Sequence, residues 1–229
     1  TTLEVLDLRS GDTSRPLIDL DECTFPVRWS DKGLVFTIQR RTDYYVYMMD
    51  NEGKIIPLLD KPGTVSLAAA VTQKGDSLAT LTATRDKPFE IYLNGKAVTD
   101  QTQYYDSKTL SHKEVVTWQS KDGTEIEGIL ITAPDLDEKK THPLLVVVHG
   151  GPTWDAFPTP TSNLYYPYEQ FVERGFILLD VNYRGSSGYG DSFRKLNYRN
   201  LGIGDYEDVI SGVDMLVEKG LADRERVGI

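Results

Sequence analysis

The chain has 229 residues, of which 39% are hydrophobic, 26% charged and 10% aromatic. This ordinary globular composition excludes a disordered chain, a collagen-like repeat and a disulfide scaffold. Thirty-five acidic and 25 basic residues give a formal net charge of −10. Such a surface repels phosphate backbones and anionic lipids, so we expect neither nucleic acid nor a membrane among the partners. The single Cys23 can form no internal disulfide, which favours a cytoplasmic location and leaves a secreted or periplasmic one open.

The first half of the chain repeats a strand-and-turn pattern. An alternating segment followed by turn residues occurs at 3–8, 45–49 and 89–93, as expected of β-strands. Val5, Val46 and Ile91 are equivalent in these segments, and they lie at steps of 41 and 45 residues. A second pattern, at 27–36 and 70–80, recurs after about the same interval. Four short strands in about 40 to 45 residues are the unit of a β-propeller blade.

We therefore predict that residues 1–111 form the C-terminal part, the last blades, of a β-propeller domain. An unrelated all-β meander with accidental spacing is the alternative. A closed propeller needs about four to eight blades, and this segment holds only some two and a half of them. We expect the remaining blades upstream of residue 1.

From residue 112 onward the pattern changes to that of an α/β sheet. The order of the predicted elements is hairpin, strand, helix, strand, helix, strand, which is typical of this class. The hairpin occupies 113–119 and 125–132, the strands 143–148, 176–181 and 226–229, and the helices 167–174 and 205–219. We predict that Asp205 caps the start of the last helix and Gly220 its end. Its buried face is predicted to consist of Tyr206, Val209, Ile210, Val213, Leu216 and Val217.

The most informative motif is His149-Gly150-Gly151-Pro152, which directly follows the apolar strand 143–148. A glycine pair at that point lets the backbone turn sharply and expose N–H groups. In α/β-hydrolases a loop at this position supplies a donor that stabilises the oxyanion of acyl transfer. We therefore predict that the backbone of Gly151 and Gly150 contributes to an oxyanion hole. A plain strand-to-helix turn is the alternative.

The segment 182–190 is rich in glycine and serine but matches no nucleotide-binding pattern. It lacks the Gly-Lys-Ser/Thr ending of a P-loop and the glycine spacing of a dinucleotide site. Ser187 is not in a nucleophile elbow, because Tyr189 stands where Gly-x-Ser-x-Gly requires glycine. We interpret this segment as a structural loop of the active site.

The three histidines, His112, His142 and His149, show no spacing typical of zinc ligands. We expect neither a metal nor another cofactor. In the chain order of α/β-hydrolases the catalytic histidine follows the nucleophile, so His149 is interpreted as a loop-shaping residue. Gly-x-Ser-x-Gly does not occur in the 229 residues. Residues 226–229 correspond to the strand that precedes the nucleophile, and we expect the reactive serine to follow Ile229.

Four segments together resemble the prolyl oligopeptidase family of serine peptidases, nearest to its acylaminoacyl-peptidase and dipeptidyl-peptidase branches. They are Trp118 to Gly123, Val148 to Pro152, Asn182 to Gly190, and Asp205 to Val209 continuing through Val227 to Ile229. The resemblance implies an N-terminal propeller joined to a C-terminal α/β-hydrolase domain, with short peptides as substrates. It also implies that the Gly151 N–H is an oxyanion donor. At the position of His149 some relatives carry a tyrosine that performs this task with its hydroxyl group.

We accordingly expect residues 1–111 to be the end of a propeller and residues 112–229 to be the N-terminal half of an α/β-hydrolase domain. The intact protein is predicted to be a serine peptidase that cleaves aminoacyl- or acylaminoacyl-peptide bonds. The present chain, lacking the serine, aspartate and histidine of the triad, is predicted to be inactive alone. The alternatives are a propeller-linked esterase of the same fold and a noncatalytic binding module with a degenerate hydrolase domain. The oligomeric state is left open, a homo-oligomer included.

Overall fold

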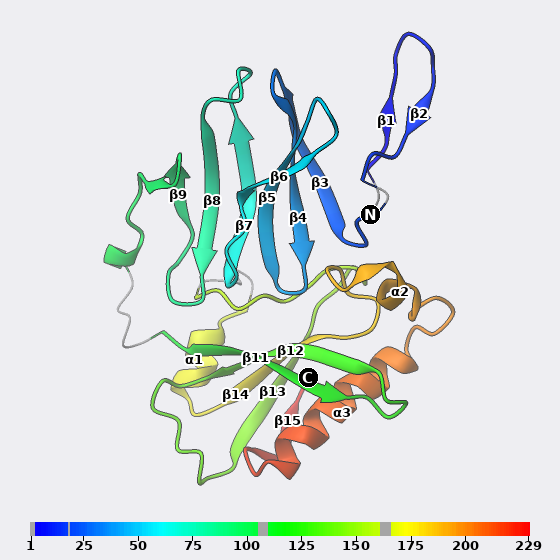
Figure 1. The fold of residues 1–229 in the computed structure, drawn as a ribbon. Coiled ribbons are helices and arrows are strands. Elements are labelled where there is room, and N and C mark those ends of the chain that lie inside the picture. The colour runs from blue at the N-terminus through cyan, green and yellow to red at the C-terminus, as the bar shows by residue number, and fades with distance from the viewer. Residues whose placement is uncertain (1–2, 18, 105–109, 161–165) are drawn as a thin grey trace. The chain divides into compact units, whose positions relative to one another are not determined.

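A computed structural model describes residues 3–17, 19–104, 110–160 and 166–229 (Figure 1). The chain divides into two compact units. The first comprises Thr1–Thr84, Phe89–Asp100 and Gly188–Asp191, and the second comprises Arg85–Pro88, Gln101–Ser187 and Ser192–Ile229. The predicted domain boundary between residues 111 and 112 stays a prediction.

The first unit consists of β-strands, as predicted, and most of them are paired antiparallel. A short hairpin pairs β1 (Val5–Leu6) with β2 (Thr13–Ser14). Two meanders of four strands each then follow one another along the chain. The first contains β3 (Cys23–Ser30), β4 (Gly33–Arg40), β5 (Asp43–Asp50) and β6 (Ile55–Leu59). The second contains β7 (Thr64–Val71), β8 (Leu78–Thr84), β9 (Glu90–Leu93) and β10 (Lys96–Ala97).

The two meanders meet at one parallel pairing, Tyr44 with Val65. The first meander is apolar on both faces, because β4 carries apolar residues at successive positions and successive side chains of a strand point to opposite faces. Leu34, Phe36 and Ile38 of β4 pack on one side, in a cluster that also contains Leu3. The intervening residues, such as Val35 and Val46, pack on the other side against Val71 of the second meander. Each meander therefore contributes one layer to a stacked arrangement.

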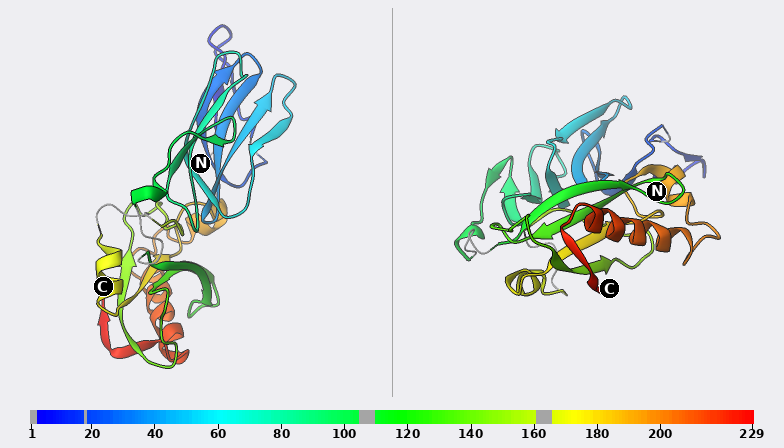
Figure 2. Two further views of the ribbon diagram at one scale, coloured as in Figure 1. Left: turned by 90° about the vertical axis from the view of Figure 1, so that its left-hand side faces the viewer. Right: turned by 90° about the horizontal axis from the view of Figure 1, so that it is seen from below.

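The second unit is built on a five-stranded mixed sheet (Figures 1 and 2). Its strand order is β11 (His112–Gln119), β12 (Glu125–Thr132), β14 (Ile177–Asn182), β13 (His142–Val148) and β15 (Ala222–Gly228). The first two pairings are antiparallel, and β13 is parallel to both β14 and β15. The helices are α1 (Tyr168–Glu173), α2 (Gly190–Lys195) and α3 (Gly204–Glu218), and a 3₁₀ turn spans Thr102–Tyr104. The predicted hairpin, the strands 143–148 and 176–181 and both helices are confirmed.

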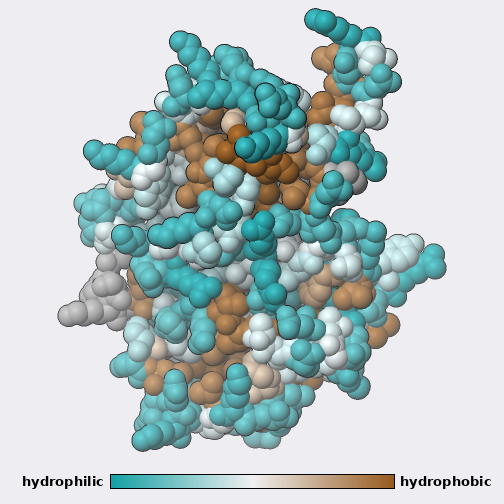
Figure 3. Space-filling view, viewed as in Figure 1, coloured by the Kyte–Doolittle hydropathy of each residue, from teal (hydrophilic) through white to brown (hydrophobic). Residues whose placement is uncertain are grey.

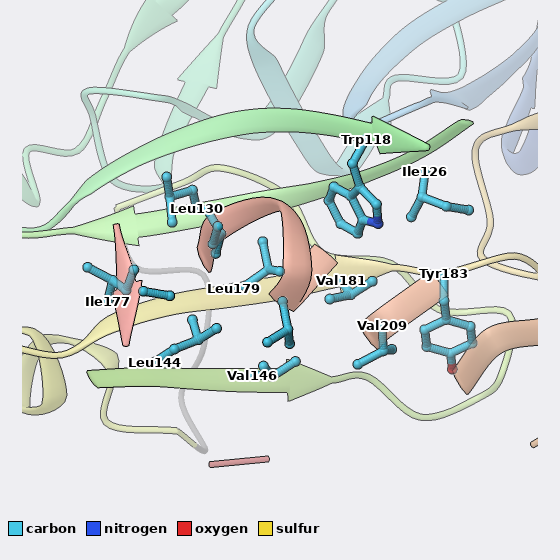
Figure 4. Close-up of a cluster of buried hydrophobic side chains, with 13 residues drawn as sticks. Trp118, Ile126, Leu130, Leu144, Val146, Ile177, Leu179, Val181, Tyr183 and Val209 are labelled. Atoms are coloured by element: carbon cyan, nitrogen blue, oxygen red, sulfur yellow. The ribbon is translucent and has the colours of Figure 1, made fainter. Parts of the chain in front are cut away.

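Helices cover both faces of this sheet. Leu179 of β14 packs towards α3, in a cluster with Val213 and Trp118. Figure 4 shows Trp118 and Leu179 with other side chains of this cluster. The preceding residue, Leu178, packs in a second cluster on the opposite face, which contains Val172 of α1. Such continuously apolar strands are expected where both faces of a sheet are covered.

Some details of the predicted elements were wrong. Helix α3 begins at Gly204 after Ile203, without a side-chain cap, so Asp205 lies within its first turn and is not the cap. Tyr206 is 57% exposed, because the buried face of α3 is centred on Gly212, against which the Trp118 ring packs. The last strand begins earlier than predicted, at Ala222. Helix α2 was not predicted.

The surface of both units is mixed in character. Figure 3 shows hydrophobic areas interrupted by hydrophilic side chains on the face that it presents. No helix in the described part of the chain is long and apolar enough to cross a membrane.

Candidate oxyanion site

Both predicted loops leave the same edge of the five-stranded sheet. Strand β13 ends at Val148 and strand β14 at Asn182, and the two strands are parallel neighbours paired from Leu144–Ile177 to Val148–Val181. In parallel sheets ligands gather at the carboxyl ends of the strands. The diglycine motif and the segment 182–190 therefore begin side by side.

The turn at Gly150 and Gly151 is exposed, and its second position needs glycine. Gly151 has φ +125°, and a Cβ atom on it would lie 2.8 Å from the backbone nitrogens of Thr153 and Trp154. Within the described residues, the structure records no hydrogen bond from the N–H of Gly150 or Gly151. Both main-chain donors are thus available to a ligand. Their role as oxyanion donors stays a prediction.

His149 is held by the loop that follows β14. Its Nε2 lies 2.9 Å from Ser186 Oγ, and Ser186 Oγ itself donates to Tyr183 O at 2.7 Å. Ser186 Oγ thus links the imidazole of His149 to the Tyr183 carbonyl. The imidazole ring also stacks on Tyr183 with 4.6 Å between centroids, and the Tyr183 hydroxyl donates to His149 O at 2.7 Å.

The second ring nitrogen of His149 contacts the diglycine turn. Nδ1 lies 3.0 Å from Gly150 O. The Gly150 carbonyl and the Gly151 N–H belong to one planar peptide group. A ring that contacts the carbonyl therefore also restricts the orientation of the Gly151 N–H. Burial lowers the pKa of His149, and the contact with the Gly150 carbonyl opposes this effect. These contacts agree with the interpretation of His149 as a loop-shaping residue.

Further along, the diglycine loop is attached at two more points. The Asn182 side chain is fully buried and bonds Ala156 twice, accepting from its N–H at 2.7 Å and donating to its carbonyl at 2.9 Å. The Ser187 N–H donates to Trp154 O at 3.1 Å. The segment 182–187 thus fixes residues 149–156 at three positions.

The sequence identified this segment as structural but not the separate tasks of its residues. The available signal was a polar run, Asn182 to Ser187, directly after a fully buried strand. Ser187 is buried. His112 and His142 lie on β11 and β13. Across the described ranges, no group of three or more His, Cys, Asp or Glu side chains is arranged to hold a metal ion.

The fold and this turn define the second unit as an α/β protein with main-chain donors exposed at the carboxyl edge of its parallel strands. Residues 164–229 match the sequence profile of the prolyl oligopeptidase family. This match confirms the resemblance that the sequence motifs indicated.

Individual relatives point the same way. The chain is 24% identical over 229 residues to the uncharacterized peptidase YuxL of Bacillus subtilis, covering 97% of this chain and 33% of that protein. It is 36% identical over 111 residues to acylamino-acid-releasing enzyme 1 of Oryza sativa, covering 47% of this chain and 13% of that enzyme. The uncomplexed acylaminoacyl peptidase of Pyrococcus horikoshii superposes with a TM-score of 0.80 at 24% identity, covering 100% of this chain and 36% of that one. This superposition shows a shared fold, and the chain spans about a third or less of each relative.

Proposed function

We propose that the chain is part of a longer serine peptidase that hydrolyses aminoacyl- or acylaminoacyl-peptide bonds in short peptides. The observation that carries this proposal is the diglycine turn: Gly150 and Gly151 are exposed, and their N–H groups make no hydrogen bond to any described residue. The match of residues 164–229 to a peptidase family and the names of the relatives support it.

We further propose that residues 1–111 are the last blades of a propeller and residues 112–229 the first half of an α/β-hydrolase domain. Two successive four-stranded meanders support the first assignment; β3 begins at Cys23 and β7 at Thr64, one predicted period later. The order of β11 to β15, with helices on both faces, supports the second.

In this proposal the chain supplies the main-chain donor that stabilises the oxyanion. A serine in the sequence after Ile229 attacks the peptide carbonyl, and a histidine takes its proton and passes it to the leaving amine. The carbonyl oxygen becomes negatively charged, and the Gly151 N–H stabilises that charge. One such donor is worth about 100- to 1000-fold in rate. No cofactor is required.

The test compares the complete protein with the 229-residue chain. We expect the complete protein to react with a fluorophosphonate probe and to cleave acylaminoacyl or aminoacyl anilides faster than simple esters. The 229-residue chain should do neither. Faster turnover of simple esters would favour the propeller-linked esterase, and a complete protein that the probe does not label would favour the noncatalytic module. Labelling of the 229-residue chain itself would contradict the placement of the nucleophile after Ile229.

A further inference from the structure

Arg184 lies at the centre of a buried ion network that the proposed mechanism does not use. Its side chain is 5% exposed, and its guanidinium binds two carboxylates, each through two bonds. Nε and Nη2 donate to Asp208 at 2.9 and 2.7 Å, and Nη1 and Nη2 donate to Asp122 at 2.8 and 3.1 Å. Nη2 also lies 3.3 Å from Ser120 Oγ. We call Arg184, Asp122 and Asp208 the arginine clamp.

The clamp joins three segments that are distant in sequence. Arg184 lies in the loop after β14, Asp208 in α3, and Asp122 in the turn between β11 and β12. The Arg184 main-chain N–H also donates to Asp208 Oδ2 at 2.8 Å, so the backbone of the loop is attached as firmly as the side chain. Asp208 is completely buried and accepts hydrogen bonds from both the main chain and the side chain of Arg184.

Stability alone is a weak explanation for such a cluster. Removing charges from water costs several kcal/mol per ion, and buried ion pairs often contribute little net stability. They do impose a single geometry, because each charge must keep its partners. Bonding to Asp208 and Asp122 raises the pKa of Arg184, and bonding to Arg184 lowers the pKa of Asp122. Arg184 and Asp122 are therefore both charged at neutral pH.

The residues on either side of Arg184 hold His149. Tyr183 stacks on the imidazole, and Ser186 Oγ lies 2.9 Å from its Nε2. Between them, Gly185 has φ +96°, and a Cβ there would lie 2.7 Å from Asn197 Nδ2. The backbone from 183 to 186 thus has little room to change at Gly185. The clamp attaches this segment to α3 and to the turn between β11 and β12.

We propose that Arg184 is a positioning residue for the oxyanion turn: held by Asp208 and Asp122, it fixes Tyr183 and Ser186, which fix His149 and thereby the Gly151 N–H. This inference rests on the proposed function. Lysine cannot replace the arginine, because only the planar fork of a guanidinium can bind two carboxylates bidentately.

The main experiment measures peptide hydrolysis by the complete protein carrying Arg184→Lys. We expect kcat to fall about 30-fold with KM within twofold of wild type, because the variant weakens an interaction made only in the transition state. Asp122→Asn is the milder variant. The Asp122 side chain is 54% exposed and the Arg184–Asp208 pair is kept, so we expect a folded protein with a three- to tenfold fall in kcat.

Lys121→Gln is the matched control. Lys121 lies in the same turn as Asp122, and its Nζ pairs with Glu207 of α3 at 3.3 Å, so the pair joins two of the three segments of the clamp without touching Arg184. We expect unchanged kcat. If both clamp variants fold and keep kcat within twofold of wild type, or if Lys121→Gln loses as much activity as Asp122→Asn, the proposal is wrong.

Crystal structures of the complete wild-type and Arg184→Lys proteins provide a readout that does not need activity. We expect the His149 Nε2–Ser186 Oγ distance of 2.9 Å in wild type and its loss in the variant. If wild type hydrolyses no peptide, the proposed function fails while this comparison still decides the clamp. An unchanged bond in Arg184→Lys would overturn the positioning role.

Discussion

The two units differ in how far apart in the sequence their contacting residues lie. Within the two meanders of the first unit, most contacts join neighbouring strands or residues about one repeat apart; Arg28 of β3, for example, bonds Gln73, 45 residues away. In the second unit Trp118 Nε1 donates to Asp208 O at 2.9 Å over 90 residues, and Arg184 reaches Asp122 over 62. The repeated meanders are therefore stabilised by contacts between neighbouring strands. The candidate site, in contrast, depends on segments distant in sequence that the five-stranded sheet brings together.

This difference predicts where substitutions act. A change in the loops of the second unit should alter activity out of proportion to stability, because few atoms fix the turn. The expected effects below run from the largest to the smallest.

Gly151→Ala should reduce the kcat of the complete protein by at least about 100-fold, the value of one oxyanion donor. The reason is geometric: φ is +125° and the added Cβ would meet two backbone nitrogens at 2.8 Å, so the turn must change. The measurement is steady-state hydrolysis of a peptide anilide.

Gly175→Ala provides the control for backbone strain. Gly175 has φ +82°, no atom lies within 4 Å of its added Cβ, and it follows α1 rather than β13. It should lose about 1 kcal/mol of stability with kcat unchanged. Equal losses of kcat in both variants would mean that strain, and not the turn at Gly151, governs activity.

His149→Ala should lower kcat by about 10- to 100-fold, less than Gly151→Ala, because the donor remains and only its support is lost. The ring contacts Gly150 O, Ser186 Oγ and Tyr183. His142→Ala is the comparison, since His142 Nε2 contacts Asp137 O in a surface loop. Retention of full activity by His149→Ala would show that the turn holds its shape without the ring.

Local patterns in the sequence predicted most of the second unit. Glycine after a periodic segment marked the end of α3 correctly: Gly220 N–H bonds Val217 O at 2.9 Å and Leu221 N–H bonds Leu216 O at 3.0 Å, as in a Schellman motif. The start of α3 was predicted wrongly because Asp205 resembles a cap, while the tertiary structure places its side chain within the first turn.

The support of the site could not be predicted in the same way. The sequence placed a glycine pair after a strand and a structural loop after the next one, and the structure brings both to one edge. Arg184, Asp122 and Asp208 are 62 and 24 residues apart, and no spacing rule connects them. The assignment of residues 1–111 to propeller blades likewise stays a prediction, because the two meanders alone do not form a closed propeller.

Gly212→Ala tests the packing of α3 and should destabilise the chain by about 2 kcal/mol. Helix propensity alone predicts stabilisation by about 1 kcal/mol. The added Cβ, however, would lie 2.8 Å from Trp118 Cζ2 and 3.0 Å from Leu179 Cδ2, so the core must shift. Ser211→Ala, one residue earlier and only half-buried, should be neutral or stabilising in the same urea titration. Stabilisation by Gly212→Ala would show that this core is loosely packed.

The smallest effect concerns Asp180 on β14, where burial raises the pKa to about 6. Tyr168 donates to its Oδ2 at 2.7 Å, and its buried Oδ1 has no partner among the described residues. Because the folded pKa exceeds the unfolded value of 3.8, the folded state holds the proton more tightly. The stability from this group is present at low pH and is lost as pH rises through about 6.

Asp180→Asn should therefore stabilise the chain by about 1 kcal/mol at pH 7.5. The neutral side chain avoids the cost of a buried charge, while its unpaired amide group offsets part of the gain. Urea titrations at pH 7.5 and 4.5 should show the gain shrinking by at least half in acid, because wild-type Asp180 is then protonated. Asp223→Asn is the opposite case: Asp223 is bonded to Arg226, which lowers its pKa, so neutralising it should give no gain at pH 7.5. A gain for Asp180→Asn that does not change with pH would show that packing, and not the buried charge, limits stability at this point of the sheet.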